Sequence, residues 1–285
     1  MTLKRFAFNT GIKTFQLTRK LLGNRMYAIL LSEFIEQVTP IQTKSTDIGD
    51  IHFYCPGRLP QWRGETLLDK EPETIEWIRG FEPNSVFWDI GANVGVFSLY
   101  AARKRNIQVL AFEPSAFNYY ILVKNIEINQ MDSDILALCL AFSDQIELRV
   151  LNMADTQLGG ALHAFGSPQD SFNVSETTNQ VVFKQGMIGI SIDEFIEMFS
   201  PAFPNHIKID VDGIEDKIIE GASNTLSDSR IKSVLVELDT NDIDYCQRVT
   251  KILEKAGLRL AMKKRSPFVE NGPFASVYNH IYVRN

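Results

Sequence analysis

The sequence predicts an α/β protein built on a mostly parallel β-sheet with helices on both faces. The first observation behind this prediction is an alternation of short apolar runs with longer helical patterns, which is typical of parallel sheets. The apolar runs span residues 86–90, 108–113 and 135–142, and the helical patterns span residues 97–105 and 117–130. The second observation is a set of four later runs of strand length, at residues 206–211, 233–238, 258–263 and 277–283.

Composition limits the class of protein. The 285 residues carry 29 Lys and Arg against 35 Asp and Glu, a net charge of −6 that argues against a nucleic-acid partner. Hydrophobic residues make up 45% of the chain, which is ordinary for a globular protein. Three separated cysteines without a CxxC pair argue against a disulfide framework or a zinc ribbon. No apolar run approaches the roughly 18 residues of a transmembrane segment. We therefore expect a soluble, cytoplasmic protein.

The N-terminal region differs from the rest in charge. Residues 1–32 contain six cations and no acid: Lys4, Arg5, Lys13, Arg19, Lys20 and Arg25. Apolar residues lie between them, as in a basic amphipathic helix. Such a helix could contact a membrane surface, serve as an organellar targeting segment, or pack on the acidic body or on a second copy in a homodimer. Residues 40–66 are rich in turn residues and predict extended chain. We expect an N-terminal extension over residues 1–65 and a second domain over residues 66–285.

Two helix starts are marked by residue type. Pro72 suits the first turn of a helix and follows the acidic Glu71. Ser191 is followed three residues later by Glu194, as in a capping box that opens a helix over residues 191–199. Between the third apolar run and this helix, strands at 146–151 and 181–184 flank a polar loop at residues 152–180. A long loop of this kind could form a lid or recognise an acceptor.

The most informative motif follows the first apolar run and opens a helix, where backbone N–H groups can meet a ligand. Gly91 permits a tight turn, Gly95 permits a close approach, and Asn93 tolerates left-handed backbone. Asp89 ends the strand and can meet a cationic or hydroxylated ligand. Glu113 ends the next strand, where an acid can bind the two hydroxyls of a ribose. The motif therefore predicts a nucleoside-containing cofactor.

Two cofactors contain such a ribose. The dinucleotide fingerprint requires a middle glycine beside the pyrophosphate. Here that position is Asn93, and Asp89 would place negative charge near the phosphates. S-adenosylmethionine has no phosphate and carries a positive sulfonium. The residues therefore favour S-adenosylmethionine over a nicotinamide dinucleotide.

Three motifs in order resemble the FkbM family of methyltransferases. They are Phe-Trp-Asp-Ile-Gly-Ala-Asn-Val-Gly at residues 87–95, Ala-Phe-Glu-Pro at 111–114, and Ile-Lys-Ile-Asp-Val-Asp-Gly at 207–213 with Glu215 and the Gly-Ala pair at 221–222. The resemblance runs from about Thr66 to about Val236. It implies a seven-stranded class I methyltransferase sheet, S-adenosylmethionine as cofactor and methylation of hydroxyl oxygens, often in polyketide, glycan or lipopolysaccharide biosynthesis. The family's third motif commonly ends in Val-Glu-Gly, so Asp212 is one methylene shorter.

The resemblance also assigns roles to residues. Asp89, Gly91, Asn93 and Gly95 correspond to the loop around the methionine moiety, and Glu113 corresponds to the ribose-binding acid. Phe142, Ser143 and Asp144 end the third apolar run, where such folds contact adenine. Core packing for Phe142 and a turn role for Asp144 are the alternatives.

The candidate catalytic residues lie in the third motif. Side chains alternate along a strand, so Lys208, Asp210 and Asp212 share one face. A lysine buried in a central strand needs a partner. Asp210, at the carboxyl end of a parallel strand, is the candidate general base, with Lys208 as a polar contact or orienting residue. The alternative is a purely structural ion pair between the two.

Other residues could serve the same chemistry. His163, in the polar loop, is a further candidate base, and His280 is an alternative. Glu237 and Asp239 could join Asp210 around Mg²⁺, which prefers oxygen ligands. Because these acids lack a diagnostic ligand spacing, we assign no metal site.

The sequence therefore predicts an S-adenosylmethionine-dependent methyltransferase that modifies a hydroxyl of a sugar, a glycan or another secondary metabolite. Its acceptor would be a small molecule or a glycan. Two alternatives stay open: a nicotinamide-dependent oxidoreductase, and a non-catalytic protein that retains the cofactor fold.

Overall fold

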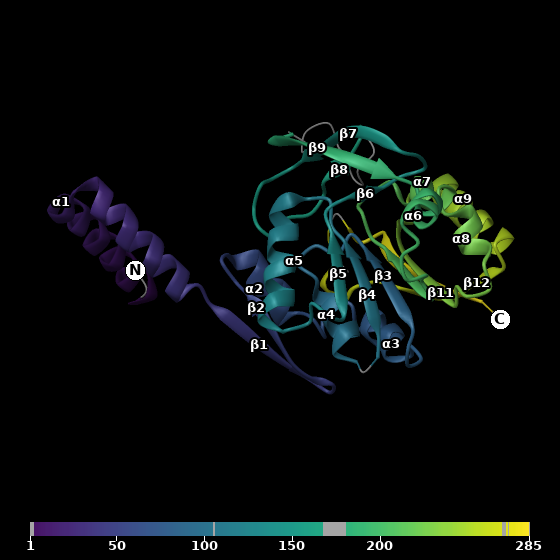
Figure 1. The fold of residues 1–285 in the computed structure, drawn as a ribbon, viewed down its shortest axis with the longest axis horizontal. Helices are drawn as coiled ribbons and strands as arrows, with labels where there is room; N and C mark the ends of the chain where they lie inside the picture. Colours follow the sequence, from purple (N-terminus) through teal and green to yellow (C-terminus); the bar gives the residue numbers. More distant parts are fainter. Residues whose placement is uncertain (1–2, 105, 168–180, 270–271, 273, 285) are drawn as a thin grey trace. The chain divides into compact units, whose positions relative to one another are not determined.

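A computed structural model describes residues 3–104, 106–167, 181–269, 272 and 274–284 (Figure 1). The chain divides into two compact units, Met1–Pro40 and Ile41–Asn285. Residues 41–65, which the sequence analysis placed in the N-terminal extension, therefore pack within the larger unit.

The smaller unit contains one broken helix. Helix α1 (Leu3–Val38) is interrupted at Gly23, whose φ of 73° lies outside the helical region. Phe15 and Phe34 lie on opposite sides of this break, yet their ring centroids are only 5.2 Å apart. At 1.5 Å per residue, a continuous helix would separate them far more, so the two halves fold back on each other. None of the helices in the described part of the chain has the length and apolar character needed to cross a membrane.

The larger unit is organised around a seven-stranded sheet, as the sequence predicts. Its strands are β3 (Val86–Ile90), β4 (Gln108–Phe112), β5 (Ile135–Leu138), β10 (His206–Ile209), β11 (Ser233–Asp239), β12 (Leu258–Lys264) and β13 (Val277–Arg284). They lie in the order β12-β13-β11-β10-β3-β4-β5. Only β13 runs antiparallel to its neighbours within this sheet. This is the predicted class I methyltransferase sheet.

Helices cover both faces of the sheet, which confirms the predicted layers (Figure 1). On one face, Phe87 and Val109 pack with α3 (Pro72–Arg79), α4 (Val96–Arg103) and α5 (Ala116–Ile128). On the other face, Trp88 and Leu110 pack with α6 (Ile192–Phe199), α7 (Glu215–Glu220), α8 (Ser223–Ser227) and α9 (Ile243–Lys255). Alternate residues of each strand thus enter two separate cores.

The two marked helix starts are correct. Helix α3 begins with Pro72 directly after Glu71. Helix α6 begins with the predicted capping box, in which Ser191 Oγ accepts from the Glu194 N–H and the Glu194 carboxylate accepts from the Ser191 N–H.

Two expectations about elements are wrong. The run at 135–142 does not form one strand, because β5 ends at Leu138 and Ala141–Phe142 forms β6 in a second sheet. That sheet has the order β6-β9-β7-β8, with β7 (Glu147–Met153), β8 (Ala164–Phe165) and β9 (Phe183–Ile190). The expected loop at 152–180 thus contains β8, and its residues 168–180 lie outside the described part of the chain.

The segment at 40–66 is only partly extended. Strands β1 (Ile41–Thr46) and β2 (Gly49–Tyr54) form the hairpin that turn-rich sequence favours. Residues Arg58–Glu65, however, form helix α2. Pro60 is compatible with this helix because it lies in the first turn, where a missing N–H costs no bond. A short 3₁₀ turn, η2 (Pro267–Val269), precedes β13.

Candidate active site

The turn after β3 brings two strand ends into contact. Gly91 has a φ of 84°, and a Cβ atom there would lie 1.8 Å from the Asp210 carbonyl oxygen. Asn93 adopts the left-handed conformation that the sequence predicts, with a φ of 52°. Gly95 also has a φ of 84°, and a Cβ atom there would lie 2.4 Å from Leu122. Gly91 therefore lets the turn pass directly beside the end of β10, and Gly95 lets it approach Leu122 of α5.

Asp89 lies beneath this turn. Its side chain is buried, and Oδ2 accepts a 2.5 Å hydrogen bond from Ser98 Oγ. Oδ1 is buried without a hydrogen-bond partner. Burial raises the pKa of Asp89, although the nearby Lys208 ammonium opposes that shift. Asp89 is therefore next to the site rather than in the walls of its cavities.

Glu113 follows β4 and is held by backbone donors. Its Oε2 accepts from the Asn93 N–H and its Oε1 accepts from the Ser115 N–H, both at 2.8 Å. Burial raises the pKa of Glu113 to about 7. Glu113 is 4% exposed and lines none of the three cavities described below, so its contact with a ribose stays a prediction.

Part of the polar loop lies beside Glu113. The Gly160 carbonyl accepts from the side-chain amides of Asn93, at 2.7 Å, and Asn118, at 3.0 Å. Asn118 also donates to Glu113 Oε1 at 3.5 Å. The sequence analysis did not single out Asn118, which lies in a helix of ordinary pattern.

An apolar cavity lies on the other side of Gly91. Its walls include Phe112, Phe142 and Val211, together with His163. Both ring nitrogens of His163 are buried and have no hydrogen-bond partner among the residues that the structure describes, and burial lowers the pKa of this imidazole. The structure thus places His163 beside Phe142. His163 does not line the two cavities formed around Asp212 and Glu237.

Ser143 and Asp144 point elsewhere. Ser143 Oγ donates to Asp144 Oδ1 at 3.0 Å and to Glu147 Oε1 at 3.1 Å, and Asp144 is exposed. Of the three residues that the resemblance places near adenine, only Phe142 lines the apolar cavity.

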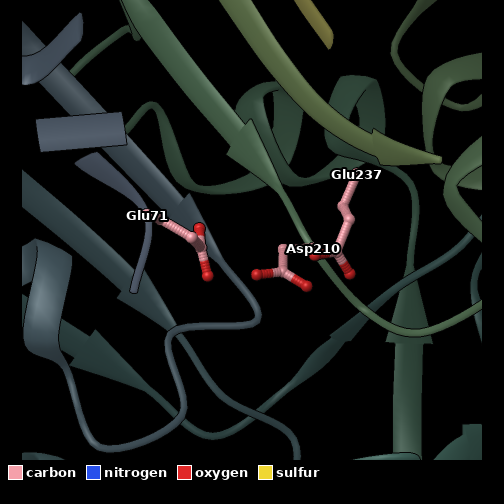
Figure 2. A group of neighbouring side chains, drawn as sticks. All are labelled: Glu71, Asp210 and Glu237. Carbon is pink, nitrogen blue, oxygen red and sulfur yellow. The ribbon is translucent and has the colours of Figure 1, made fainter. Parts of the chain in front are cut away.

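Two partly buried ion pairs meet near the end of β10. The Nζ atom of Lys208 lies 2.5 Å from Asp210 Oδ2, which confirms that the two side chains share a face. The Nζ atom of Lys70 lies 2.6 Å from Glu71 Oε1, just before α3. Figure 2 shows Glu71 and Asp210 directed toward a third carboxylate, that of Glu237 on β11. One oxygen from each of these three acids lies within 4.8 Å of the others.

The charges in this cluster shift proton affinities in opposite directions. Burial disfavours ionisation of Asp210, but the Lys208 and Lys70 ammonium groups outweigh it and lower the pKa. For Glu237, burial and the negative charges of Asp210 and Glu71 all raise the pKa well above its usual range. Burial and Asp210 raise the pKa of Asp212 to about 6.

Two adjoining cavities meet at the cluster. The smaller, of about 120 Å³, lies against the turn at residues 91–93 and reaches Lys208 and Asp210. The larger, of about 260 Å³, has walls from Trp62, Leu162, Phe274, Val277, Ser266 and Asn279. Residues common to both are Arg63, Lys70, Glu71, Ala161, Asp212 and Glu237.

Residues 62–66 are a segment that the sequence places over the cofactor, with Trp62 facing a sugar, but the pattern does not single out Arg63, Lys70 or Glu71. Arg63 lies on α2 and donates from Nε to the Gly159 carbonyl at 2.8 Å. Lys70 and Glu71 carry no pattern beyond a helix start. His280, the alternative base, is buried on β13 and lines none of these three cavities; burial lowers its pKa to about 4.

The three acids could supply oxygen ligands to a metal ion, but Asp210 and Glu71 are each already paired with a lysine. Lys208 and Lys70 supply positive charge within hydrogen-bonding distance of Asp210 and Glu71. Asp239 is buried at the end of β11 and lines neither cavity. The protein therefore provides its own charge compensation at this cluster.

Comparison with known proteins identifies the family. The profile of the methyltransferase FkbM domain matches residues 89–260. The hexuronic acid methyltransferase AglP of Haloferax volcanii is 25% identical over 206 residues, which cover 71% of this chain and 75% of that protein. Methyltransferase 1 of Beauveria bassiana is 24% identical over 191 residues, covering 65% of this chain and 76% of its own.

One solved structure is also among the proteins to which the chain is similar. It is the FkbM methyltransferase of Methylobacillus flagellatus, with 16% identity and a TM-score of 0.46, covering 71% of this chain and 44% of that one. The domain match spans more than half of the residues and contains both the glycine turn and the Lys208–Asp210 motif. The chain therefore belongs to the FkbM methyltransferase family, whose members use S-adenosylmethionine as the methyl donor.

Proposed function

We propose that the protein methylates a hydroxyl oxygen of a sugar or glycan, and that the sugar carries an acidic group. The observation that carries this proposal is the junction of the two cavities. The smaller cavity adjoins the glycine turn, the larger has an aromatic wall at Trp62, and both share the carboxylate of Glu237. A donor and an acceptor can therefore meet beside an acid–base cluster.

The residues of the site fit S-adenosylmethionine. The smaller cavity is rich in carboxylates, which suit a cofactor with a sulfonium and an ammonium group. The apolar cavity holds the unpartnered ring nitrogens of His163, which can hydrogen-bond the edge of an adenine. Glu113 connects the two cavities. It directly follows Phe112, which lines the apolar cavity, and its carboxylate accepts a hydrogen bond from the N–H of Asn93, which lines the smaller cavity.

S-adenosylmethionine supplies an electrophilic methyl group on a positively charged sulfur. The protein then has to align the acceptor oxygen and remove its proton. We propose that Asp210 and Lys208 serve this step as a charged pair at the mouth of the smaller cavity, where the lysine holds the aspartate in place. We propose that His163 contacts the adenine instead of acting as a base, because it lines the apolar cavity and neither of the other two cavities.

The larger cavity suits an acidic sugar. Trp62 offers an apolar face, and Ser266 and Asn279 offer polar atoms to hydroxyl groups. Arg63 uses only Nε for its bond to Gly159, which leaves the two terminal nitrogens for a carboxylate. The relative from Haloferax volcanii acts on a hexuronic acid, which is consistent with this choice.

The proposal predicts methyl transfer from radiolabelled S-adenosylmethionine to UDP-glucuronic acid, with lower kcat/KM for UDP-glucose. Replacing Arg63 with Gln should raise KM for the glucuronate and leave that for the glucose compound nearly unchanged. Binding of S-adenosylmethionine without methylation of any sugar would favour a non-catalytic protein. Binding of NADH in place of S-adenosylmethionine would favour an oxidoreductase.

A further inference from the structure

Glu237 differs from the other acids of the cluster in its partners. Asp210 and Glu71 each have an ammonium group at hydrogen-bonding distance. For Glu237, the described part of the chain contains no ion pair. The side chain is nevertheless half-buried on β11, beside Asn279, its register partner on β13. On the other side of β11 lies β10, which Asp210 directly follows.

Glu237 also occupies a position that suits contact with an acceptor. It lines the small cavity beside the glycine turn and the large cavity beside Trp62. Lys208 lines only the small one. An acceptor hydroxyl that enters from the larger cavity therefore meets Glu237 where the two cavities join.

The surroundings of Glu237 give it high proton affinity. The acids that face it are Asp210 and Asp212, which follow β10, and Glu71, which precedes α3. Lys70 is the cation with the largest effect on it, and Arg63 lines the same two cavities. Asn279, on the neighbouring strand, is neutral and donates to Glu71 at 3.3 Å. Burial and three negative charges outweigh the positive charge, so the group holds a proton more strongly than an ordinary glutamate.

We propose that Glu237 is the general base of the reaction and takes the proton directly from the acceptor hydroxyl. This inference rests on the proposed O-methylation. The O–H bond breaks and its proton passes to a Glu237 oxygen, while an oxygen lone pair forms the new C–O bond. The C–S bond breaks, and its electron pair stays on sulfur as S-adenosylhomocysteine leaves.

Asp210 is suited to a different task. Its ion pair with Lys208 keeps it ionised and lowers its proton affinity, which makes it a weak base. Its negative charge raises the proton affinity of Glu237 instead. Asp210 thus acts through its neighbour, as a positioning and charge-setting residue.

The base has to be ionised before it can accept a proton. In the absence of cofactor, burial and the surrounding acids raise the pKa of Glu237 and so favour its protonated form. The positive charge of the sulfonium lowers that proton affinity when the cofactor is bound. Cofactor binding is therefore expected to release protons to the solvent, and this release can be measured without an acceptor.

The test is titration calorimetry near neutral pH in phosphate and in Tris, whose different ionisation enthalpies report the number of protons released. S-adenosylmethionine and S-adenosylhomocysteine are compared, because only the first carries the sulfonium. Glu113 and the amino group of the cofactor contribute equally to both titrations. We expect the wild-type protein to release more protons with S-adenosylmethionine. Equal release for the two compounds would overturn the proposal.

Variants assign the release to a residue. Glu237→Gln should abolish the difference between the two compounds, whereas Glu220→Gln, an exposed glutamate on α7, should leave it unchanged. Glu237→Gln should also lower kcat about 10²–10⁴-fold while cofactor binding persists. A Glu237→Gln protein with wild-type proton release or wild-type kcat would exclude Glu237 as the base.

A failure of the proposed O-methylation would give different results from a failure of Glu237 as the base. A folded wild-type protein that does not bind S-adenosylmethionine would contradict the proposed function itself. Methyl transfer that is insensitive to Glu237 would contradict only the choice of base. Glu237→Gln removes a half-buried acid surrounded by like charges, so we expect the variant to unfold at the same temperature as wild type or higher. The wild-type comparison of the two compounds needs no variant at all.

Discussion

Lys208 and Asp210 form an ion pair in which the lysine side chain is 1% exposed and the aspartate 22%. Both lie on the face of β10 that is turned toward α4, and the Lys208 ammonium also lies 5.0 Å from the ring centroid of Phe97. A buried ammonium loses hydration, and the negative charges of Asp210, Glu71 and Asp89 offset that loss and raise its pKa. The pair is therefore part of both the fold and the site.

Replacing Lys208 with Met should lower the free energy of unfolding by about 3 kcal/mol near neutral pH, because it leaves buried acids without their main cation. The loss should shrink below about pH 4, where protonated Asp210 no longer needs a partner. Urea unfolding measures both effects. Lys251→Met, at an exposed position on α9, should change stability by less than about 0.5 kcal/mol. Equal stability of the two variants would contradict the assigned burial of Lys208.

Replacing Glu113 with Gln should weaken S-adenosylmethionine binding about 10–100-fold. The variant keeps the shape of the side chain but loses the charge-assisted hydrogen bonds, each of which contributes about 1.5–3 kcal/mol. Calorimetric titration of the two proteins gives the ratio of dissociation constants. Glu82→Gln, exposed before β3, is the matched control. Unchanged affinity in Glu113→Gln would show that the acid does not touch the cofactor.

The Gly91 position should tolerate no side chain. In Gly91→Ala the new Cβ would collide with the Asp210 carbonyl, and the left-handed backbone would cost about 1–2 kcal/mol in addition. We expect a lower melting temperature and loss of cofactor binding together. Gly186→Ala on β9 is the control, because a Cβ there meets nothing within 4 Å. A Gly91→Ala protein that melts with the control would contradict the close approach of β3 and β10.

The sequence predicts those parts of the structure that local pattern determines. Strand β3 coincides with the predicted run at 86–90, because a strand buried on both faces is continuously apolar. The same reasoning wrongly predicts one strand over residues 135–142, because the apolar residues of β5 and β6 belong to two different sheets. Apolar character reports burial, and it does not report which sheet a residue joins.

The candidate site also divides into residues that local motifs predict and residues that only the assembled fold brings together. Asp89 to Gly95 and Lys208 to Asp210 lie in local motifs, so residue spacing alone predicts their proximity to a cofactor. Arg63, Lys70 and Glu71 reach the same cavities through the packing of α2 and α3. No spacing rule connects those residues with β10, because their proximity arises only when the whole sheet is assembled.

Removal of divalent metal should leave the methyltransferase activity unchanged. Lys208 and Lys70 already compensate Asp210 and Glu71, so the cluster does not require Mg²⁺ for its charge balance. The measurement is the initial rate of methyl transfer after dialysis against EDTA, with and without added MgCl₂. A rate that falls on dialysis and returns with Mg²⁺ would show that a metal enters the cluster despite the lysines.

Glu215 should make stability depend on pH in the opposite sense to an ion-paired acid. It is fully buried on α7, where it accepts from the N–H groups of Val211 and Gly213 and from the Tyr245 hydroxyl. Burial raises its pKa to about 8, against about 4.3 in an unfolded chain. Between these values the folded state binds the extra proton, so stability falls as pH rises, by at most about 1.4 kcal/mol per pH unit for this group.

Replacing Glu215 with Gln should therefore reduce that slope, because glutamine resembles the protonated acid and does not titrate. Urea unfolding from about pH 5 to about pH 8 measures the slope for both proteins. Glu113 and Asp212, whose pKa values are also raised by burial, should retain part of it in the variant. Identical slopes would mean that Glu215 is already ionised at pH 5 in the folded protein, and that the Tyr245 hydroxyl and the two N–H groups stabilise its charge more than burial disfavours it.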